Sequence, residues 1–437
     1  MVTVGIDIGT TSVKAIAADD DGRVVARARV PHRLLVPAPD RFEHDAVEAW
    51  REGPRRALAE LGTGDAQAVC VAAMVPSLTA VNDDGVPMTP GLLYGDVRGR
   101  TGSSANPAAS GEMGAFLRWQ ASAAPNARGY WPAQAVANYA LGGEGVIDTM
   151  TAATAHPLFD WTGWDAAAVE AAGGRVDQLA RIVNSNEAAG KVGEAVLAAG
   201  TVDAMGEQIV AGADDDGDVL VICGTTLITW AVLSPPEGTV PDVSSDYYSI
   251  PHTAPGKWLA GGPSNAGGLF LEWASRMLAD GPQASDPNRV PVWAPYPRGE
   301  RVPLHDPDRR GHLADLDLTH DAGAVRRAAF EAAGFVVRRT LDDVAPGARR
   351  LVATGGGVRA PEWVASLADC TGLPVDIVEV PEGGALGAAF LARVAGGLET
   401  DMTDGRRWAR VERRLEPDPR WVEPAHRRYE RFRDLAG

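Results

Sequence analysis

VGIDIGTTSVKAIAADDDG, residues 4–22, is the stretch from which we predict the fold. Apolar and β-branched residues run up to a Gly-Thr-Thr break that begins at Gly9, and they resume until Asp20-Asp21-Gly22, whose residue types are typical of turns. A second strand-like run, residues 23–30, follows that turn. Short apolar runs separated by turn residues predict strands joined by tight turns. We therefore expect the chain to open with a β-hairpin.

A second copy of this pattern, LVICGTTLITWAVLSPPEG, occupies residues 220–238. Its Gly-Thr-Thr begins at Gly224, nearly half the chain after the first. A repeat at this spacing indicates two similarly built domains, and 437 residues exceed what one hydrophobic core usually supports. We predict an N-terminal domain of residues 1–216 and a C-terminal domain of residues 217–437, with an apolar strand at residues 208–211 just before the boundary.

Apolar residues recur at three- and four-residue spacing in three segments, which predicts helices at residues 46–61, 322–344 and 361–371. Because strands and helices alternate, the expected fold class is α/β. We expect the charged tail from Arg406 onward to be a closing helix packed on the second domain. The aromatic residues spaced through this tail are Trp408, Trp421, Tyr429 and Phe432.

Composition and charge argue against several function classes. The chain has 41 Lys plus Arg and 58 Asp plus Glu, and its formal charge of −17 repels nucleic acid backbones and anionic lipid surfaces. No window offers the roughly 18 uninterrupted apolar residues of a membrane span. The cysteines lie far apart without the spacing of a zinc or redox motif, which fits reduced thiols and a cytoplasmic location. Nucleic acid and membrane partners are therefore not expected.

Asp7 lies inside an otherwise apolar strand, where a carboxylate without a partner would cost several kcal/mol. One interpretation is a ligand to Mg²⁺, through water, beside a phosphate-binding turn at Gly9. The other is a carboxylate bonded to nearby backbone N–H groups. The adjoining Gly-Thr-Thr favours the metal, because glycine lets backbone and hydroxyl donors approach a phosphate.

Two later glycine-containing segments are candidate nucleotide contacts. Gly224-Thr225-Thr226 would face the first Gly-Thr-Thr across a cleft and hold phosphates from the other side, although a simple strand-to-strand turn is the alternative. Gly355-Gly356-Gly357 joins a strand to a helix. Three glycines let the backbone lie against a flat or anionic ligand, and they also build tight loops that bind nothing.

GIDIGTTSVKA at residues 5–15 resembles the opening of the FGGY family of carbohydrate kinases, and later segments resemble that family in the same order. These are YGDVR at 94–98, YPRGERVP at 296–303, ATGGGVRAPEW at 353–363 and GGALGAAFLA at 383–392. The resemblance covers nearly the whole chain. It implies two actin-like, ribonuclease H-like ATPase domains with a central cleft, and transfer of the γ-phosphate from ATP with Mg²⁺ to a small sugar.

The resemblance also implies a role for each candidate residue. The catalytic base of this family closes a V-A-G-x-x-D segment, which makes Asp215 the candidate here and Asp214 the second choice. The alternative is a simple turn, because Asp and Gly are typical turn residues. Asp7 would be the metal ligand. The sugar side would be formed by Val75, Pro76, Ser77, Asp96 and Arg98, and the ATP side by Thr10, Thr11, Lys14, Gly224, Thr225, Thr226, Gly355, Gly356 and Gly357.

The chain departs from the family pattern in two places. A glycine- and alanine-rich helix usually follows the base, whereas here the strand at Val219 comes almost directly after Asp216. Xylulokinases, which resemble this chain, carry Q-M-H-G where it has Met74-Val75-Pro76-Ser77, so no imidazole is available to bond a sugar hydroxyl.

We expect a kinase of a ketopentose such as xylulose. The alternatives are a weakly catalytic or inactive sensor of sugar and nucleotide and, more remotely, an actin-like ATPase. The expected partners are a small-molecule sugar and ATP, and a homodimer is left open.

Overall fold

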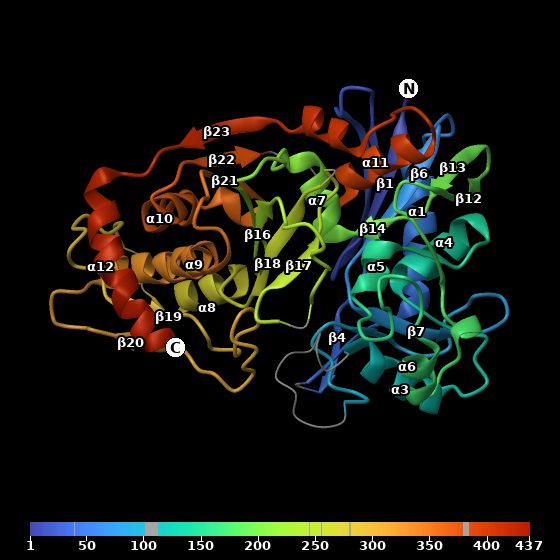
Figure 1. Ribbon diagram of the computed structural model, residues 1–437, viewed down its shortest axis with the longest axis horizontal. Helices are drawn as coiled ribbons and strands as arrows, with labels where there is room; N and C mark the ends of the chain where they lie inside the picture. Colours follow the sequence, from blue (N-terminus) through green and yellow to red (C-terminus); the bar gives the residue numbers. More distant parts are fainter. Residues whose placement is uncertain (39, 101–111, 244, 255, 279–280, 379–383) are drawn as a thin grey trace. The chain divides into compact units, whose positions relative to one another are not determined.

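The computed structural model describes residues 1–38, 40–100, 112–243, 245–254, 256–278, 281–378 and 384–437 (Figure 1). It forms two compact units. The first comprises Met1–Gly212 and Val380–Trp408, and the second comprises Ala213–Glu379 and Ala409–Gly437. The chain therefore passes between the units three times, at 212/213, 379/380 and 408/409.

These units differ from the two contiguous halves expected from the sequence. The first break lies at Gly212 rather than after Asp216, and a segment near the C-terminus returns to the first unit. The strand predicted at residues 208–211 is wrong, because these residues end the helix α7 (Asp203–Ala211). An apolar run of four residues fits a buried strand and a buried helix equally well, so the local pattern could not distinguish them.

The first unit is built on a seven-stranded sheet with the order β12-β13-β6-β1-β2-β3, and β14 also pairs with β6. β1 and β2 are antiparallel, which confirms the predicted opening hairpin, while β6 runs parallel to β1. The strands are β1 (Thr3–Ile8), β2 (Ser12–Ala18), β3 (Val24–Pro31), β6 (Ala68–Ala73), β12 (Ala188–Val192), β13 (Ala195–Ala198) and β14 (Thr201–Val202).

At the centre of this sheet both faces are buried, because successive side chains of β6 point to opposite faces and enter different cores. Val69 and Val71 pack into the core beneath α1 (Gly53–Leu61) and α4 (Ala133–Gly142), whereas Cys70 and Ala72 pack against α7 and α11 (Gly384–Ala395). Figure 1 shows α11 beside β1 and β6. The helix predicted at residues 46–61 is a π-helical turn, η1 (Val47–Glu52), that continues into α1.

A smaller five-stranded sheet of the first unit has the order β4-β5-β8-β7-β9, and β10 pairs with β11. The strands of the five-stranded sheet are β4 (Leu35–Ala38), β5 (Arg41–His44), β7 (Ser77–Val81), β8 (Gly91–Leu93) and β9 (Gly129–Trp131). The separate pair consists of β10 (Val146–Asp148) and β11 (Arg181–Val183). The other helical segments are α3 (Glu112–Ala123), α5 (Thr149–Ala153), α6 (Ala166–Ala171), η2 (Val176–Gln178) and η4 (Met402–Trp408).

The second unit repeats the central arrangement of the first. β15 (Asp218–Cys223) is antiparallel to β16 (Leu227–Leu233) and parallel to β21 (Arg350–Thr354), as β1 is to β2 and β6. The full order is β17-β18-β16-β15-β21-β22-β23. The remaining strands are β17 (Tyr248–Pro251), β18 (Trp258–Ser264), β19 (Val292–Ala294), β20 (His312–Ala314), β22 (Val375–Val378) and β23 (Val411–Leu415).

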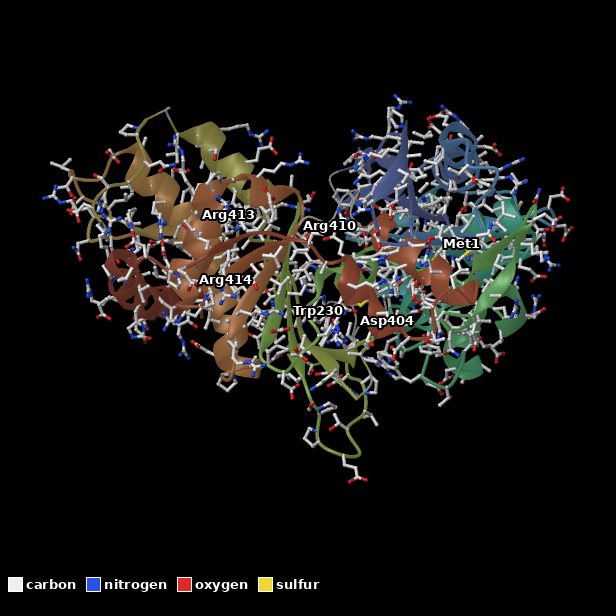
Figure 2. The ribbon with its side chains drawn as sticks, turned by 90° about the horizontal axis from the view of Figure 1, so that it is seen from above. Met1, Trp230, Asp404, Arg410, Arg413 and Arg414 are labelled. Carbon is white, nitrogen blue, oxygen red and sulfur yellow. The ribbon has the colours of Figure 1, made fainter. Side chains whose placement is uncertain are left out.

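Helices α9 (Ala322–Val344) and α10 (Pro361–Thr371) coincide with their predictions, and they pack with α8 (Gly268–Met277) and α12 (Pro419–Ala436) around one core. The prediction of a helical tail from Arg406 is correct only from Pro419. Before it, η4 belongs to the first unit and β23 adds an edge strand, on which Arg413 and Arg414 lie (Figure 2). None of the helices in the described ranges is long and apolar enough to span a bilayer.

Candidate active site

The first Gly-Thr-Thr forms the turn between β1 and β2, which we call the first hairpin turn (residues 9–11). The N–H of Gly9 donates to the carbonyl of Ser12 at 3.1 Å and closes the turn. Thr11 is exposed, and the hydroxyl of Thr10 lies 3.0 Å from that of Tyr94. The turn therefore presents backbone and hydroxyl groups at one edge of the sheet.

Strand register brings acidic residues to the same edge. Asp7, which is 6% exposed, lies opposite Lys14 on β2 and opposite Ala72 on β6. Thr201 of β14 also lies opposite Ala72, from the other side of β6, and Asp203 follows two residues later as the first residue of α7. Because β1, β6 and β14 are parallel, their carboxyl ends place Asp7 and Asp203 at one sheet edge.

Burial perturbs the carboxyl groups at this edge. It raises the pKa of Asp203 to about 6, although a hydrogen bond from the Ala204 N–H (2.7 Å) and the charge of Lys14 oppose the shift. Glu207 lies one helical turn after Asp203, on the same face of α7. Burial, followed by the charges of Asp203 and Asp7, raises the pKa of Glu207 to about 8, and Lys14 again opposes the shift.

These residues fit a hard cation through oxygen ligands, because Asp7 is buried and the Glu207 Oε2 is a buried carboxyl oxygen without a hydrogen-bond partner. Within the described part of the chain, no set of three or more His, Cys, Asp or Glu residues is arranged to hold a metal ion by itself. A Mg²⁺ ion here would therefore need water and phosphate oxygens to complete its shell, which is its usual mode of binding.

The two residues expected to act as base belong to the second unit. Asp215 is exposed in the turn before β15, where its N–H donates to the Asp218 carboxylate at 3.2 Å. Asp214 is buried, and its Oδ1 lies 3.7 Å from the His252 Nε2. Both residues precede β15, whereas Gly224 follows it, so six strand residues separate them by roughly 20 Å. Within the second unit, Asp215 and Asp214 therefore lie at the opposite end of β15 from the second Gly-Thr-Thr turn.

A near match to the V-A-G-x-x-D pattern that suggested Asp215 occurs at residues 198–203, Ala-Ala-Gly-Thr-Val-Asp, with alanine in place of the valine, and it ends at Asp203. A helix containing Ala204 and Gly206 follows directly. A helix of the kind that the family pattern places after its base thus follows Asp203. Sequence reasoning missed Asp203, although a strand, a glycine and an acidic residue at a helix start were the signal.

In the second unit, the second hairpin turn (residues 224–226) and the triple-glycine loop lie at one sheet edge. The Gly224 N–H donates to the Thr226 carbonyl at 3.1 Å. A Cβ on Gly355 would lie 2.8 Å from the carbonyl oxygen of Cys223, the last residue of β15, and one on Gly357 would meet the same oxygen and the Trp363 ring. A Cβ on Gly356 would meet nothing within 4 Å. The predicted nucleotide segments of this unit are therefore neighbours.

The residues predicted on the sugar side belong to the first unit, and internal contacts engage several of their polar groups. Asp96 is fully buried and accepts hydrogen bonds from the Phe42 N–H (2.8 Å) and the Arg98 Nη2 (2.6 Å). The Arg98 Nη2 also lies 2.7 Å from the Glu43 Oε2. The Ser77 hydroxyl accepts from a backbone N–H at 3.1 Å. Val75 and Pro76 are half-buried beside it.

Two repeated α/β units, each with a Gly-Thr-Thr turn at a sheet edge, define the class of actin-like, ribonuclease H-like ATPase folds. Solved structures support this class: xylulose kinase from Rhodospirillum rubrum is 26% identical with a TM-score of 0.85, covering 100% of this chain and 98% of that one. The corresponding enzyme from Brucella ovis is 22% identical with a TM-score of 0.87 and the same coverage.

The family follows from the sequence comparisons. Residues 2–102 match the N-terminal domain and residues 219–396 the C-terminal domain of the FGGY family of carbohydrate kinases. Xylulose kinase of Escherichia coli K12 is 26% identical, over 99% of this chain and 98% of that protein, and gluconokinase of Bacillus subtilis is 25% identical, over 90% and 87%. The chain belongs to the FGGY family and is an enzyme of the sugar kinase class.

Proposed function

We propose that this sugar kinase uses Asp203, rather than Asp215 or Asp214, as the base that accepts the proton of the attacking sugar hydroxyl. The observation that supports this choice is the half-buried Asp203, with its desolvated carboxyl group, at the sheet edge that carries Asp7 and the first hairpin turn. With its pKa raised to about 6, Asp203 is ionised at neutral pH and is a stronger base than an exposed aspartate.

In the proposed reaction, Asp203 takes the hydroxyl proton while the sugar oxygen forms a bond to the γ-phosphorus and the bond from that phosphorus to the leaving ADP oxygen breaks. Asp7 would hold Mg²⁺ through water. The bound ion would neutralise charge on the phosphates. Backbone N–H and hydroxyl groups of Thr10 and Thr11 would orient the phosphates, and Lys14 would add positive charge beside Asp7.

A ketopentose such as xylulose is our first candidate substrate. Xylulose kinases, gluconokinases and glycerol kinases are all among the similar proteins, so the panel of candidates extends to aldonates and polyols. Asp96 and Ser77 are engaged inside the protein, which supports a role in shaping the sugar side instead of direct contact. The missing imidazole near Ser77 should then alter which hydroxyl pattern is preferred.

The alternative of an inactive sensor was motivated by a missing helix after the base. A helix does follow Asp203, so that motivation no longer applies. Active phosphoryl transfer is therefore the function that we favour.

The decisive experiment measures ADP release with Mg²⁺ and ATP across ketoses, aldonates and polyols for the wild type, Asp203→Asn and Asp215→Asn. We expect Asp203→Asn to lower kcat by about 10²- to 10⁴-fold, because it removes the base. Asp215→Asn is the matched control and should retain wild-type turnover, since Asp215 is an exposed turn residue. Nucleotide binding by each variant verifies that the site has folded.

Two results would contradict the proposal. Normal turnover by Asp203→Asn together with loss of turnover in Asp215→Asn would return the base to Asp215. Absence of stimulation by every sugar in the wild type, with intact nucleotide binding, would favour the sensor.

A further inference from the structure

A buried hydrogen-bond relay lies directly behind the first hairpin turn. The indole N–H of Trp50 lies 3.0 Å from the His44 Nδ1, and the His44 Nε2 lies 2.8 Å from the Thr10 carbonyl oxygen. Trp50 and His44 are both fully buried. Trp50 comes from η1 and His44 from the last position of β5, and neither lies in the segments quoted above for the resemblance to the family.

The relay has only one arrangement of protons. An indole N–H can only donate, so the His44 Nδ1 must be the acceptor. The proton of the neutral imidazole then lies on Nε2, which donates to the Thr10 carbonyl. Burial, together with the neighbouring His32, lowers the pKa of His44 to about 4, so the ring stays neutral and keeps this tautomer at physiological pH.

The relay determines which way the peptide between Thr10 and Thr11 faces. In a planar trans peptide the carbonyl and the following N–H point in opposite directions. Because the Thr10 carbonyl is bound to His44 behind the turn, the Thr11 N–H is directed to the opposite side of that peptide. The His32 N–H also donates to the Thr11 carbonyl at 3.0 Å, and its ring packs edge-on against His44 with centroids 4.5 Å apart.

The second unit holds the equivalent carbonyl in a different way. Thr225 occupies the position in the second Gly-Thr-Thr that Thr10 occupies in the first. Its carbonyl accepts the backbone N–H of Leu269, at the start of α8, at 3.1 Å. In both copies of the turn, a donor behind the turn therefore fixes the same carbonyl. The first unit uses a side chain for this purpose, which makes that contact accessible to mutation.

We propose that His44, held in one tautomer by Trp50, is a positioning residue that orients the first hairpin turn so that the Thr11 N–H binds a phosphate group of the nucleotide. This inference rests on the proposed function, in which the first hairpin turn contacts ATP. It adds a specific role for two residues outside that turn. His44 touches neither reactant and acts through the Thr10–Thr11 peptide.

The test measures binding of Mg²⁺ and a non-hydrolysable ATP analogue by calorimetry for the wild type, His44→Leu and His44→Gln. We expect His44→Leu to weaken nucleotide binding about tenfold, the loss of roughly one hydrogen bond. The Gln amide can both donate to Thr10 and accept from Trp50, so His44→Gln should bind within about threefold of the wild type. The KM for the sugar should change little in either variant.

His252→Leu is a matched control. The His252 Nε2 is also bound to a backbone carbonyl, that of Ala213 at 2.9 Å, and its Nδ1 accepts the Ala254 N–H at 2.7 Å. This carbonyl precedes β15, at the opposite end of that strand from the second hairpin turn. His252→Leu should lower the melting temperature without changing the affinity for the nucleotide. Trp50→Phe, which removes the donor to His44 together with part of the ring system but leaves His44 in place, provides a second variant if His44→Leu does not fold, and it should weaken nucleotide binding about threefold.

The outcomes separate this inference from the proposed function. Wild-type nucleotide affinity in His44→Leu, or in Trp50→Phe if His44→Leu does not fold, would overturn the role of His44 and leave the kinase assignment intact. Equal losses in nucleotide affinity for His44→Leu, His44→Gln and His252→Leu would reduce His44 to a structural residue and also overturn it. Failure of every sugar to stimulate ADP release would contradict the proposed kinase activity. The binding measurements would still test whether His44 affects the affinity for the nucleotide.

Discussion

Glu207 is a carboxylic acid that its surroundings keep protonated in the folded first unit. Burial and the charges of Asp203 and Asp7 raise its pKa from an ordinary value of 4.5 to about 8. Between these values, the folded state holds a proton that the unfolded state has released. The free energy of unfolding therefore falls as pH rises through this window, and the contribution levels off above the folded pKa.

Glu207→Gln should remove this dependence, because the amide stays neutral at every pH. Near pH 4.5 we expect the variant and the wild type to have similar free energies of unfolding. As the pH rises to about 8, the variant should become progressively more stable than the wild type. Urea denaturation of the ligand-free proteins across this range measures the difference. A difference that stays constant with pH would show that Glu207 ionises at its ordinary pKa.

Asp203 illustrates how far single-residue reasoning reaches. The family pattern V-A-G-x-x-D ends at Asp215, and a near match with alanine in place of the valine ends at Asp203, which we propose as the base. The two candidates differ in burial and in the strand that precedes them. Asp203 follows β14, which pairs with β6, and β6 in turn pairs with β1. That pairing joins residues about 130 positions apart along the chain and leaves no local mark in the sequence. Asp7, whose burial in an apolar strand was visible directly, needed no such information.

At the scale of elements, the repeat predicted the hairpin at the centre of each large sheet, and the helical periodicity predicted α1, α9 and α10. α9 and α10 begin and end where apolar spacing placed them. The end of α7 and the start of the tail were mispredicted, because short segments depend on their neighbours. β23, for example, pairs with β22, and Arg414 on it lies 3.2 Å from the Asp376 carboxylate. Charged residues at an edge strand do not show a strand pattern on their own.

The crossing of α7 and α11 depends on glycine. A Cβ on Gly387 would lie 1.8 Å from the Gly206 carbonyl oxygen, and one on Gly206 would lie 2.6 Å from that of Gly384. A Cβ on Gly384 would in turn lie 2.7 Å from the carbonyl oxygen of Asp203. The two helix backbones therefore touch where α7 begins, and this contact fixes the position of the proposed base.

Gly387→Ala should force α7 and α11 apart and destabilise the protein by about 1–3 kcal/mol. It should also lower kcat, because Asp203 moves with the start of α7. Gly64→Ala is the control, since a Cβ there would meet nothing within 4 Å. Urea denaturation and ADP release compare the two variants. Equal stability of both would show that the helices can separate at no cost.

At the scale of the whole molecule, the chain completes its first unit only after it has built most of the second. Val380–Trp408 returns to the first unit, where α11 covers the sheet face that carries Cys70 and Ala72. The predicted division into two contiguous halves overlooked this return, because residues 383–392 resemble a nucleotide-site loop and an apolar helix does not reveal which sheet it covers. The first unit is thus made of two segments that are distant in sequence.

A fragment of residues 1–212 should therefore fail to fold cooperatively, because it leaves the face beneath α11 exposed to water. Joining residues 384–408 to it through a flexible linker should restore a cooperative transition. Gly206 and Gly384 are in close approach, and α7 is only about 14 Å long, so roughly ten linker residues span the gap from Gly212. Near-UV circular dichroism and urea denaturation of the two fragments test this expectation.

The outcome distinguishes two accounts of the first unit's stability. If α11 supplies a necessary part of the core, the linked fragment alone shows a sharp transition, and Gly387→Ala within it weakens that transition because the added methyl separates α7 from α11. If residues 1–212 unfold cooperatively without α11, the core beneath α1 and α4 is sufficient by itself, and α11 serves mainly to position Asp203. In that case Gly387→Ala should lower kcat in the full chain while leaving the free energy of unfolding nearly unchanged.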